Sequence, residues 1–148
     1  MYKLFPLIVL LFAVTSCKTY TEKDKQTFDQ QIKEYLAKKG IECTRSDSGL
    51  YYKILEPGEG ENIRFQDVVS FSYKGSFLSG EVFDEEKKPI EFAVKDLIGA
   101  WKEIMLELKP GAKAFLIAPP HLGYGDRKLD DIPPNSILVY ELEIEAVK

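Results

Sequence analysis

The sequence is short of the residue types on which most catalytic and metal sites depend. Its 148 residues include one histidine, His121, one tryptophan, Trp101, and only two cysteines. No histidines, cysteines and carboxylates stand together at metal-ligand spacing, and no pair of carboxylates is held together by its spacing. Metal-dependent and hydrolytic mechanisms are therefore poor candidates, and we predict that the protein uses no metal and no cofactor.

Positive charge is also scarce relative to negative charge. The chain has 20 lysines and arginines against 24 aspartates and glutamates, a formal net charge of −4 at pH 7, and its lysines are spread rather than clustered. Nucleic-acid binding needs a basic face that displaces counterions from phosphates, so we exclude nucleic acid as a partner. The 45% hydrophobic content supports one domain with a buried core.

The N-terminus carries an apolar run of signal-peptide length. The run covers residues 4–14, follows Lys3, and is too short for an ordinary membrane-spanning helix. It ends in Val-Thr-Ser-Cys, with the cysteine at Cys17, which resembles the lipobox of bacterial lipoproteins. We predict a signal peptide over residues 1–16 and a lipid anchor on Cys17 that holds the protein at a membrane. The alternative is an ordinary cleaved signal peptide.

An anchor of this kind implies a place in the bacterial cell envelope. Lys18 follows the cysteine, and the absence of an aspartate there favours the outer membrane, with the domain facing the periplasm. Once residues 1–16 are removed, Cys43 is the only other cysteine, so no internal disulfide can form. We expect Cys43 to be a small buried apolar residue.

Residues 17–48 are expected to hold the anchor, a polar spacer and one helix. Thr21 followed by Asp24 is typical of a helix start, and Gly40 after two lysines is typical of a helix end. The apolar stripe consists of Phe28, Ile32, Tyr35 and Leu36. Because so thin a stripe does not stabilise a helix alone, the helix over residues 21–39 must pack against another surface.

From residue 49 the apolar residues alternate with a period of two, which predicts a sheet. We expect strands over residues 50–55, 68–77, 89–94, 111–118 and 136–147. Asp96 is expected to cap a helix whose apolar stripe is Leu97, Trp101, Met105 and Leu108. The charged run at residues 85–88 is expected to be a solvated loop. This order predicts an α+β domain over residues 49–148, in which a curved antiparallel sheet wraps around one central helix.

Residues 118–125 form the most distinctive segment of the domain. They read Ala-Pro-Pro-His-Leu-Gly-Tyr-Gly, so prolines fix the backbone on one side of a corner and glycines free it on the other. Such a corner holds Tyr124 in a defined place. Together with Trp101 and the Phe83-Asp84 pair, Tyr124 is expected to line a small aromatic cavity with few polar groups. His121 is expected to stabilise the corner or lie at the surface, without a chemical role.

These features together resemble an FKBP-type peptidyl-prolyl isomerase domain over residues 49–148. The motifs are Gly49-Leu50, Tyr52, Gly58 and Gly60, residues 72–75, Gly80, Phe83-Asp84, Pro89, Phe92, Ile98, Trp101, Pro110-Gly111, residues 119–125 and residues 132–134. Each motif is weak alone, but their order and spacing are specific. The leader, the anchor and the N-terminal helix lie outside the resemblance.

The resemblance implies an enzyme that isomerises peptide bonds before proline, with proline-containing polypeptides as substrates. It implies the catalytic residues Tyr73, Phe83, Asp84, Trp101 and Tyr124, and the substrate-binding residues Ile90, Leu97, Ile98, Ile132 and Tyr140. The proline ring would pack on Trp101, and the hydroxyl of Tyr124 would bind the substrate backbone. Asp84 would face the twisting imide, and the backbone N–H of Ile98 would receive a substrate carbonyl.

The residues suit this chemistry because rotation about a prolyl bond needs no nucleophile. The barrier is amide resonance, about 18–20 kcal/mol, and an apolar pocket disfavours the more polar planar form. Three positions depart from the family pattern: Ile90 replaces an aromatic residue, Ala100 a glycine and Leu97 a frequent valine. They motivate an alternative from another class, a chaperone module that binds proline-containing segments but isomerises them poorly. An inert envelope lipoprotein is a third, weaker hypothesis.

An uncovered apolar strip is expected on the sheet face opposite the central helix. It consists of Phe115, Ile117, Ile137 and Val139. A strip of this kind needs a cover, which the N-terminal helix can provide. The cover comes either from the same chain or from a second copy in a homodimer, and the sequence leaves both arrangements open.

Overall fold

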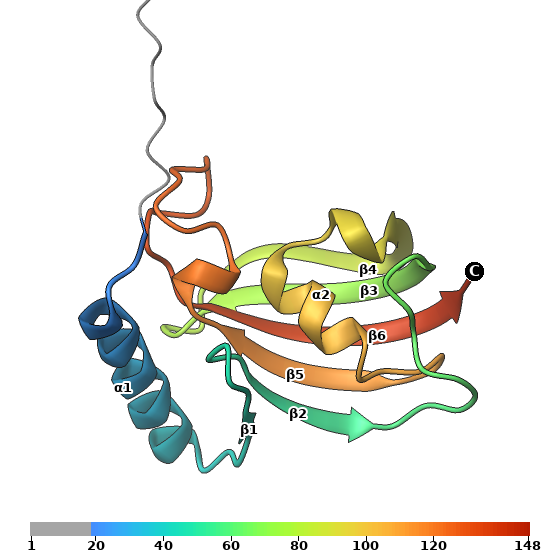
Figure 1. Ribbon diagram of the computed structural model, residues 1–148, viewed down its shortest axis with the longest axis horizontal. Helices are drawn as coiled ribbons and strands as arrows, with labels where there is room; N and C mark the ends of the chain where they lie inside the picture. The colour runs from blue at the N-terminus through green and yellow to red at the C-terminus, as the bar shows by residue number, and fades with distance from the viewer. Residues whose placement is uncertain (1–18) are drawn as a thin grey trace, which may run out of the picture.

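A computed structural model describes residues 19–148, so the predicted signal peptide and the predicted lipid anchor at Cys17 lie outside the described residues. Two α-helices and a sheet make up the fold (Figure 1). The elements are α1 (Glu22–Lys39), β1 (Thr44–Arg45), β2 (Tyr51–Glu56), β3 (Val68–Phe77), β4 (Val82–Ala93), the 3₁₀ turn η1 (Val94–Asp96), α2 (Gly99–Met105), β5 (Lys113–Ala118), the 3₁₀ turn η2 (Pro120–Leu122) and β6 (Leu138–Val147).

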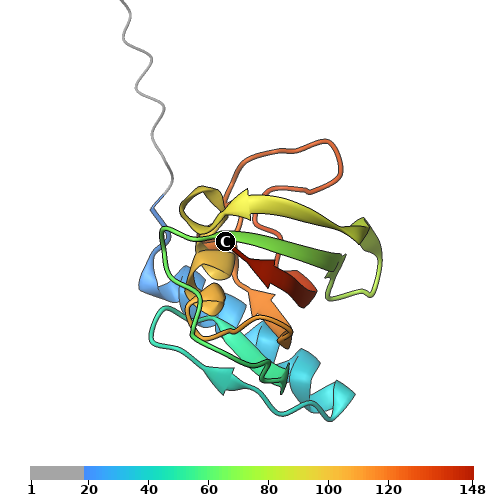
Figure 2. The same cartoon turned by 90° about the vertical axis from the view of Figure 1, so that its right-hand side faces the viewer.

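The six strands form one antiparallel sheet in the order β1-β2-β5-β6-β3-β4. The sheet curls around α2 without closing into a barrel (Figure 2). This arrangement confirms the predicted fold class, an α+β domain with a curved antiparallel sheet, a central helix and a preceding N-terminal helix.

The face of the sheet toward α2 carries the main core. In β3, Val69 and Phe71 are fully buried. In β6 the first three residues, 138–140, are all buried, and from Glu141 to Ile144 exposed and buried residues alternate. Trp101, Ile104 and Met105 of α2 pack into the same cluster. The predicted period-two pattern is confirmed in β3 and in the second half of β6, whereas the start of β6 is buried on both faces, with Val139 on the side opposite α2.

The opposite face of the sheet is covered by α1 of the same chain. Ile32 and Leu36 of α1 pack on Tyr51, Ile117, Ile137 and Val139, with the half-buried Phe28, Tyr35, Phe115 and Cys43 around them. The predicted apolar strip therefore exists, and the chain covers it itself. Residues that neighbour each other across β2, β5 and β6 supply this surface: Tyr51 faces Ile117, and Ile117 faces Val139.

The ends of α1 are those expected from its sequence. The Thr21 side chain accepts a bond from the backbone N–H of Asp24, and the Asp24 carboxylate accepts one from the backbone of Thr21. Gly40 ends the helix with a left-handed φ of 65°, which glycine adopts without strain. None of the helices formed by residues 19–148 combines the length and apolarity needed to span a membrane.

Two predictions about the segment before α2 are wrong. The strand expected over residues 89–94 is in fact β4, which runs from Val82 to Ala93. Residues 85–88, expected to form a loop, belong to this strand, because β4 pairs with β3 along most of its length. Asp96 does not cap α2. It ends η1, and the chain stays extended through the buried Leu97 before α2 starts, with Ile98 at its N-cap. Burial of Leu97 at this point delays the helix.

Candidate functional site

Trp101, near the start of α2, lies at the centre of an aromatic cluster. Its ring centroid is 4.9 Å from that of Tyr140, 5.0 Å from that of Tyr73 and 5.2 Å from that of Phe71, and each pair meets edge to face. The Trp101 side chain is buried, with its indole Nε1 lacking a hydrogen-bond partner among the described residues. The cluster therefore presents apolar ring surface with little hydrogen-bonding capacity.

Gly75 makes room for two of these rings. It lies opposite Tyr140 on β6 and opposite Asp84 on β4. A Cβ at this position would lie 2.7 Å from the Phe83 ring and 2.8 Å from the Tyr140 ring, closer than real contacts allow. The absence of a side chain lets Phe83 and Tyr140 meet at a centroid distance of 5.8 Å over the middle of the sheet.

Asp84 is an exposed carboxylate at the edge of the cluster. It accepts a hydrogen bond from the hydroxyl of Tyr73. Burial raises the pKa of Tyr73, and the hydrogen bond to Asp84 and its negative charge raise the pKa further. Burial also raises the pKa values of Tyr124 and Tyr140. All three phenols therefore stay neutral and able to donate hydrogen bonds near neutral pH.

Two adjoining hollows open over Trp101. One, of about 320 Å³, lies between the Phe83 side and the β5–β6 loop, and the other, of about 270 Å³, lies between β4 and the start of α2. Tyr73, Trp101 and Tyr124 line both. These volumes are close to the lower end of small-molecule sites, about 300–1,000 Å³.

The structure brings all ten predicted site residues to these hollows. The first is lined by Tyr73, Phe83, Asp84, Trp101, Tyr124, Ile132 and Tyr140, and the second adds Ile90, Leu97 and Ile98. Sequence reasoning did not predict five further lining residues: Phe92, Asp96, Leu129, Asp130 and Asp131. Phe92 stands two residues after Ile90 on β4, so the strand period was a usable signal. For the residues of the β5–β6 loop, 129–131, the sequence held no such signal.

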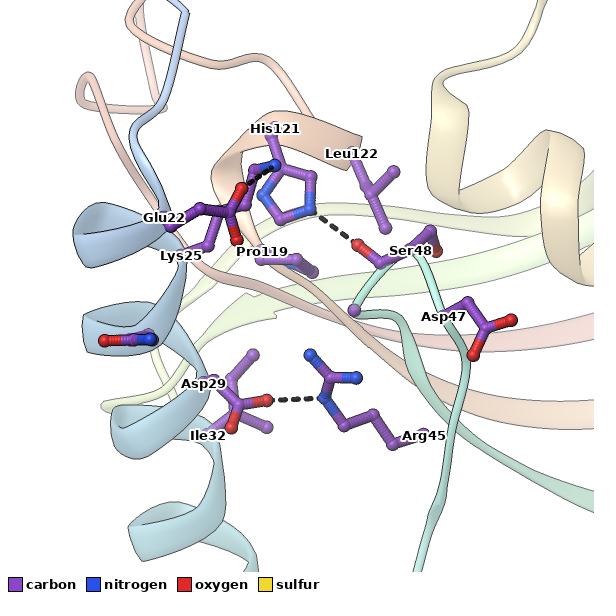
Figure 3. Close-up of a pocket in the computed structure, with 12 residues that line it drawn as sticks. Glu22, Lys25, Asp29, Ile32, Arg45, Asp47, Ser48, Pro119, His121 and Leu122 are labelled. Atoms are coloured by element: carbon purple, nitrogen blue, oxygen red, sulfur yellow. Dashed lines mark hydrogen bonds and ion pairs between the residues drawn. The ribbon is translucent and has the colours of Figure 1, made fainter.

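A further hollow of about 370 Å³ lies between α1, the segment after β1, and η2 (Figure 3). Its carboxylate Asp29 has several partners. It accepts hydrogen bonds from Arg45 at 2.6 Å and from Tyr51 at 2.7 Å, and Lys33 lies 2.7 Å from its other oxygen. Partial burial would raise the pKa of Asp29, but the hydrogen bonds outweigh it and lower the pKa to about 2. This hollow is a polar joint that fixes α1.

His121 contributes to the same joint. Its Nε2 lies 2.7 Å from the backbone oxygen of Ser48, and because a carbonyl only accepts, Nε2 carries the proton and donates (Figure 3). This bond ties the corner at residues 119–125 to the turn before β2, as expected for a corner-stabilising residue. Among residues 19–148, no group of three or more histidine, cysteine or acidic side chains is arranged to hold a metal ion.

Comparison with known proteins shows to which family of domains this curled sheet and its central helix belong. Residues 59–145 match the family model of FKBP-type peptidyl-prolyl cis-trans isomerases. The chain belongs to the FKBP-type peptidyl-prolyl cis-trans isomerase family.

Relatives show how far the similarity extends. FkpA of Escherichia coli K12, an FKBP-type peptidyl-prolyl cis-trans isomerase, is 36% identical over 141 residues, which cover 90% of this chain and 52% of FkpA. A probable isomerase of this type from Haemophilus influenzae is 37% identical over 110 residues, which cover 72% of this chain and 46% of that protein. The chain thus spans about half the length of the curated relatives it matches.

Solved structures agree with the fold. The crystal structure of Escherichia coli FkpA has a TM-score of 0.74 at 36% identity, covering 86% of this chain and 62% of that one. A peptidyl-prolyl cis-trans isomerase from Pseudomonas syringae has a TM-score of 0.73 at 27% identity, covering 88% of this chain and 98% of that one.

Proposed function

We propose that this protein is a peptidyl-prolyl cis-trans isomerase that assists the folding of exported proteins. The observation that carries the proposal is Trp101, buried at the floor of two hollows and ringed edge-on by Tyr73 and Tyr140. Uncatalysed exchange at proline takes tens to hundreds of seconds, so a folding protein benefits from acceleration. Membership of the family supports the same activity.

The proposed mechanism is desolvation of the imide without proton transfer. A planar imide carries more charge separation than a twisted one, so a site poor in polar groups lowers the energy of the twisted form relative to the planar one. The proline ring packs on Trp101, and Tyr73, Phe83 and Tyr140 form the walls. Ile132 closes the loop side.

The polar groups of the site hold the substrate rather than react with it. The hydroxyl of Tyr124 binds the substrate backbone, and the N–H of Ile98 receives a substrate carbonyl. Asp84 faces the twisting imide, with the Tyr73 hydroxyl fixing the direction of its carboxylate. The exposed position of Asp84 leaves its other oxygen accessible to the substrate.

The second candidate function is a chaperone module that binds proline-containing segments with little turnover. Ile90 favours it, because an aliphatic residue lines the hollow over Trp101 where an aromatic one is common in the family. Phe92 weighs against the chaperone hypothesis, because it supplies an aromatic ring to the same hollow. Its ring centroid lies 6.4 Å from that of Phe71. Ala100 carries no weight, because it is fully buried in the core and lines neither hollow.

The proposed location is the bacterial cell envelope. We retain residues 1–16 as a signal peptide, Cys17 as a lipid anchor, residues 17–48 as spacer and helix, and residues 49–148 as the isomerase domain. The outer membrane, with the domain facing the periplasm, remains our proposal for the anchor. A homodimer through α1 gains no support from the fold, since α1 already covers the strip in its own chain.

The test is a peptide isomerisation assay with a short X-Pro peptide and the purified domain. We expect acceleration that Trp101→Ala and Asp84→Ala both reduce, the former by about tenfold or more. Leu106→Ala, an exposed position at the end of α2, and Asp47→Ala, an exposed carboxylate, are the matched controls. No acceleration at micromolar domain with an intact circular dichroism spectrum would eliminate the enzyme. Suppressed aggregation of an unfolded client under those conditions would favour the chaperone module.

A further inference from the structure

A hollow of about 590 Å³ opens beside Tyr124, and the described N-terminal residues form one of its walls. Tyr20 and Lys25 stand on that side, Leu97 and Ile98 on another, and Arg127 of the β5–β6 loop completes the rim. We call this space the arm subsite. The motifs that carry the family resemblance leave out Tyr20 and Lys25, so this wall is a feature of the N-terminal segment.

The arm subsite adjoins the hollow between β4 and the start of α2. Leu97, Ile98 and Tyr124 line both the arm subsite and the hollow of about 270 Å³ beside Trp101. An extended chain advances about 3.3–3.6 Å per residue. A polypeptide whose proline sits on Trp101 and which leaves over Tyr124 therefore enters the arm subsite within a few residues.

The two ends of this row of hollows differ in charge, and the hollow between them is lined by one carboxylate, Asp96. Lys25 and Arg127 line the arm subsite, with Asp126 as the carboxylate among its described lining residues. The far end, near Ile132, is lined instead by Asp84, Asp130 and Asp131. Within residues 19–148, Arg127 has no carboxylate at ion-pairing distance, and Lys25 pairs at 2.9 Å with Glu22, which is itself highly exposed.

We propose that the arm subsite binds the client segment flanking the proline and prefers acidic over basic residues there. The inference rests on the proposed isomerase function and deepens it by naming a class of substrate. The cations Lys25 and Arg127 at the arm subsite favour binding of an anionic segment there. The carboxylates near Ile132 disfavour binding of the same anionic segment at the other end. The effect of a solvent-exposed charge pair is modest, about a two- to fivefold difference in kcat/KM.

The wall of the arm subsite is held in place before any substrate arrives. The Tyr20 hydroxyl donates a bond of 2.7 Å to Asn135, and its ring meets Phe28 edge-on at 5.5 Å. Lys25 lies in the first turn of α1, over the η2 corner beside His121, and the pairing of Asp29 with Arg45 fixes the helix below it (Figure 3). A preorganised wall costs little ordering entropy on binding.

The experiment compares one X-Pro tetrapeptide with longer peptides built on it. Each longer peptide has four extra residues on the N-terminal or the C-terminal side of the tetrapeptide, and these four include either two glutamates or two lysines. For each peptide, kcat/KM and the Kd from calorimetry are measured with the full mature protein. We expect the glutamate form to exceed the lysine form in kcat/KM by about two- to fivefold for extension on one side. The preference should disappear in about 1 M salt.

Charge reversal then assigns the effect to the arm subsite. Lys25→Glu and Arg127→Glu should each abolish or reverse the ratio of glutamate to lysine forms. Lys23→Glu, the same change in the same helical turn but outside the lining, should leave the ratio unchanged. Equal ratios for both extensions, or equal effects of Lys25→Glu and Lys23→Glu, would overturn the inference.

The two proposals fail separately. If wild type does not isomerise the tetrapeptide, the proposed function is lost, while the Kd values of the charged peptides still decide whether the arm subsite exists. If the tetrapeptide is isomerised and the extensions bind without regard to charge, only the arm subsite is lost.

Discussion

The hydroxyl of Tyr20 donates a hydrogen bond of 2.7 Å to Oδ1 of Asn135, a residue 115 positions further along the chain. Asn135 lies in the β5–β6 loop with a left-handed φ of 60°, and its backbone N–H donates to the oxygen of Gly125 at 2.8 Å. The segment before α1 thus braces the loop that carries Tyr124 and Ile132.

We expect Tyr20→Phe to lower the free energy of unfolding by about 1 kcal/mol, since it removes the hydrogen bond to Asn135 and keeps the ring. Asn135→Ala should cost about 1–2 kcal/mol more, because alanine tolerates the left-handed backbone poorly. Urea unfolding followed by circular dichroism measures both. Tyr52→Phe, whose hydroxyl has no hydrogen bond among the described residues, is the control. An equal loss in all three variants would contradict the bracing role.

The rate of isomerisation should be nearly independent of pH between about 6 and 9. Burial and the neighbouring carboxylate raise the pKa of Tyr73, and burial raises those of Tyr124 and Tyr140, so the phenols stay protonated well above their usual value near 10. The proposed mechanism also moves no proton. A pH profile of kcat/KM checks this expectation, and a bell-shaped curve would argue for acid–base catalysis instead.

Gly75→Ala should damage the site more than the fold. The new Cβ would overlap the Phe83 and Tyr140 rings, at 2.7 and 2.8 Å, and displace them. We expect a stability loss of about 1–3 kcal/mol and at least a tenfold fall in kcat/KM. Gly80→Ala is the matched control: its φ of 91° strains an alanine, but a Cβ there meets nothing within 4 Å. It should lose stability and keep activity.

Acid should weaken the attachment of α1. The pKa of Asp29 is lowered from 3.8 to about 2, so its bonds stabilise the fold above about pH 4, and that contribution is lost as the pH falls through 2. Asp29→Asn should cost about 1–2 kcal/mol at pH 7 and almost nothing near pH 1.5. Urea titrations at several pH values test this, with Asp47→Asn as the control in the same hollow. A cost independent of pH would contradict it.

Ile32→Ala should loosen α1 from the sheet. Ile32 is fully buried against Ile117 and Val139, so truncation leaves a cavity and should cost about 2–4 kcal/mol. Gln31→Ala, at the exposed neighbouring position, should change stability by less than about 0.5 kcal/mol. Light scattering of a chain shortened to residues 41–148 extends the test, because the bared strip should make it associate. An unchanged mass would show that the strip needs no cover.

Local sequence patterns predicted the structural features that depend only on residues close together in the chain. The N-cap pair Thr21 and Asp24, the Gly40 stop and the alternation in β3 and β6 are properties of short segments, and the structure reproduces them. The gathering of the ten site residues followed from the resemblance, because a family pattern encodes long-range contacts that spacing alone does not.

The remaining features depend on partners far away in the sequence. Residues 85–88 look like a solvated loop because all four are charged, but pairing with β3 makes them an edge strand whose side chains stay in water. The start of α2 moved from Asp96 because burial of Leu97 holds the chain extended. The arm subsite needs Tyr20 to meet Asn135, a contact that no local pattern predicts.

Cys17 and Tyr20 are only three positions apart in the sequence, which has a consequence for where the proposed isomerase would work. Three residues extend at most about 11 Å. Tyr20 is fixed against the β5–β6 loop. A lipid on Cys17 would therefore hold the opening of the proposed proline site close to the bilayer surface, rather than leave the domain free to diffuse away from it. Polypeptide chains emerging at the membrane would then meet the proposed isomerase site before chains that have already been released.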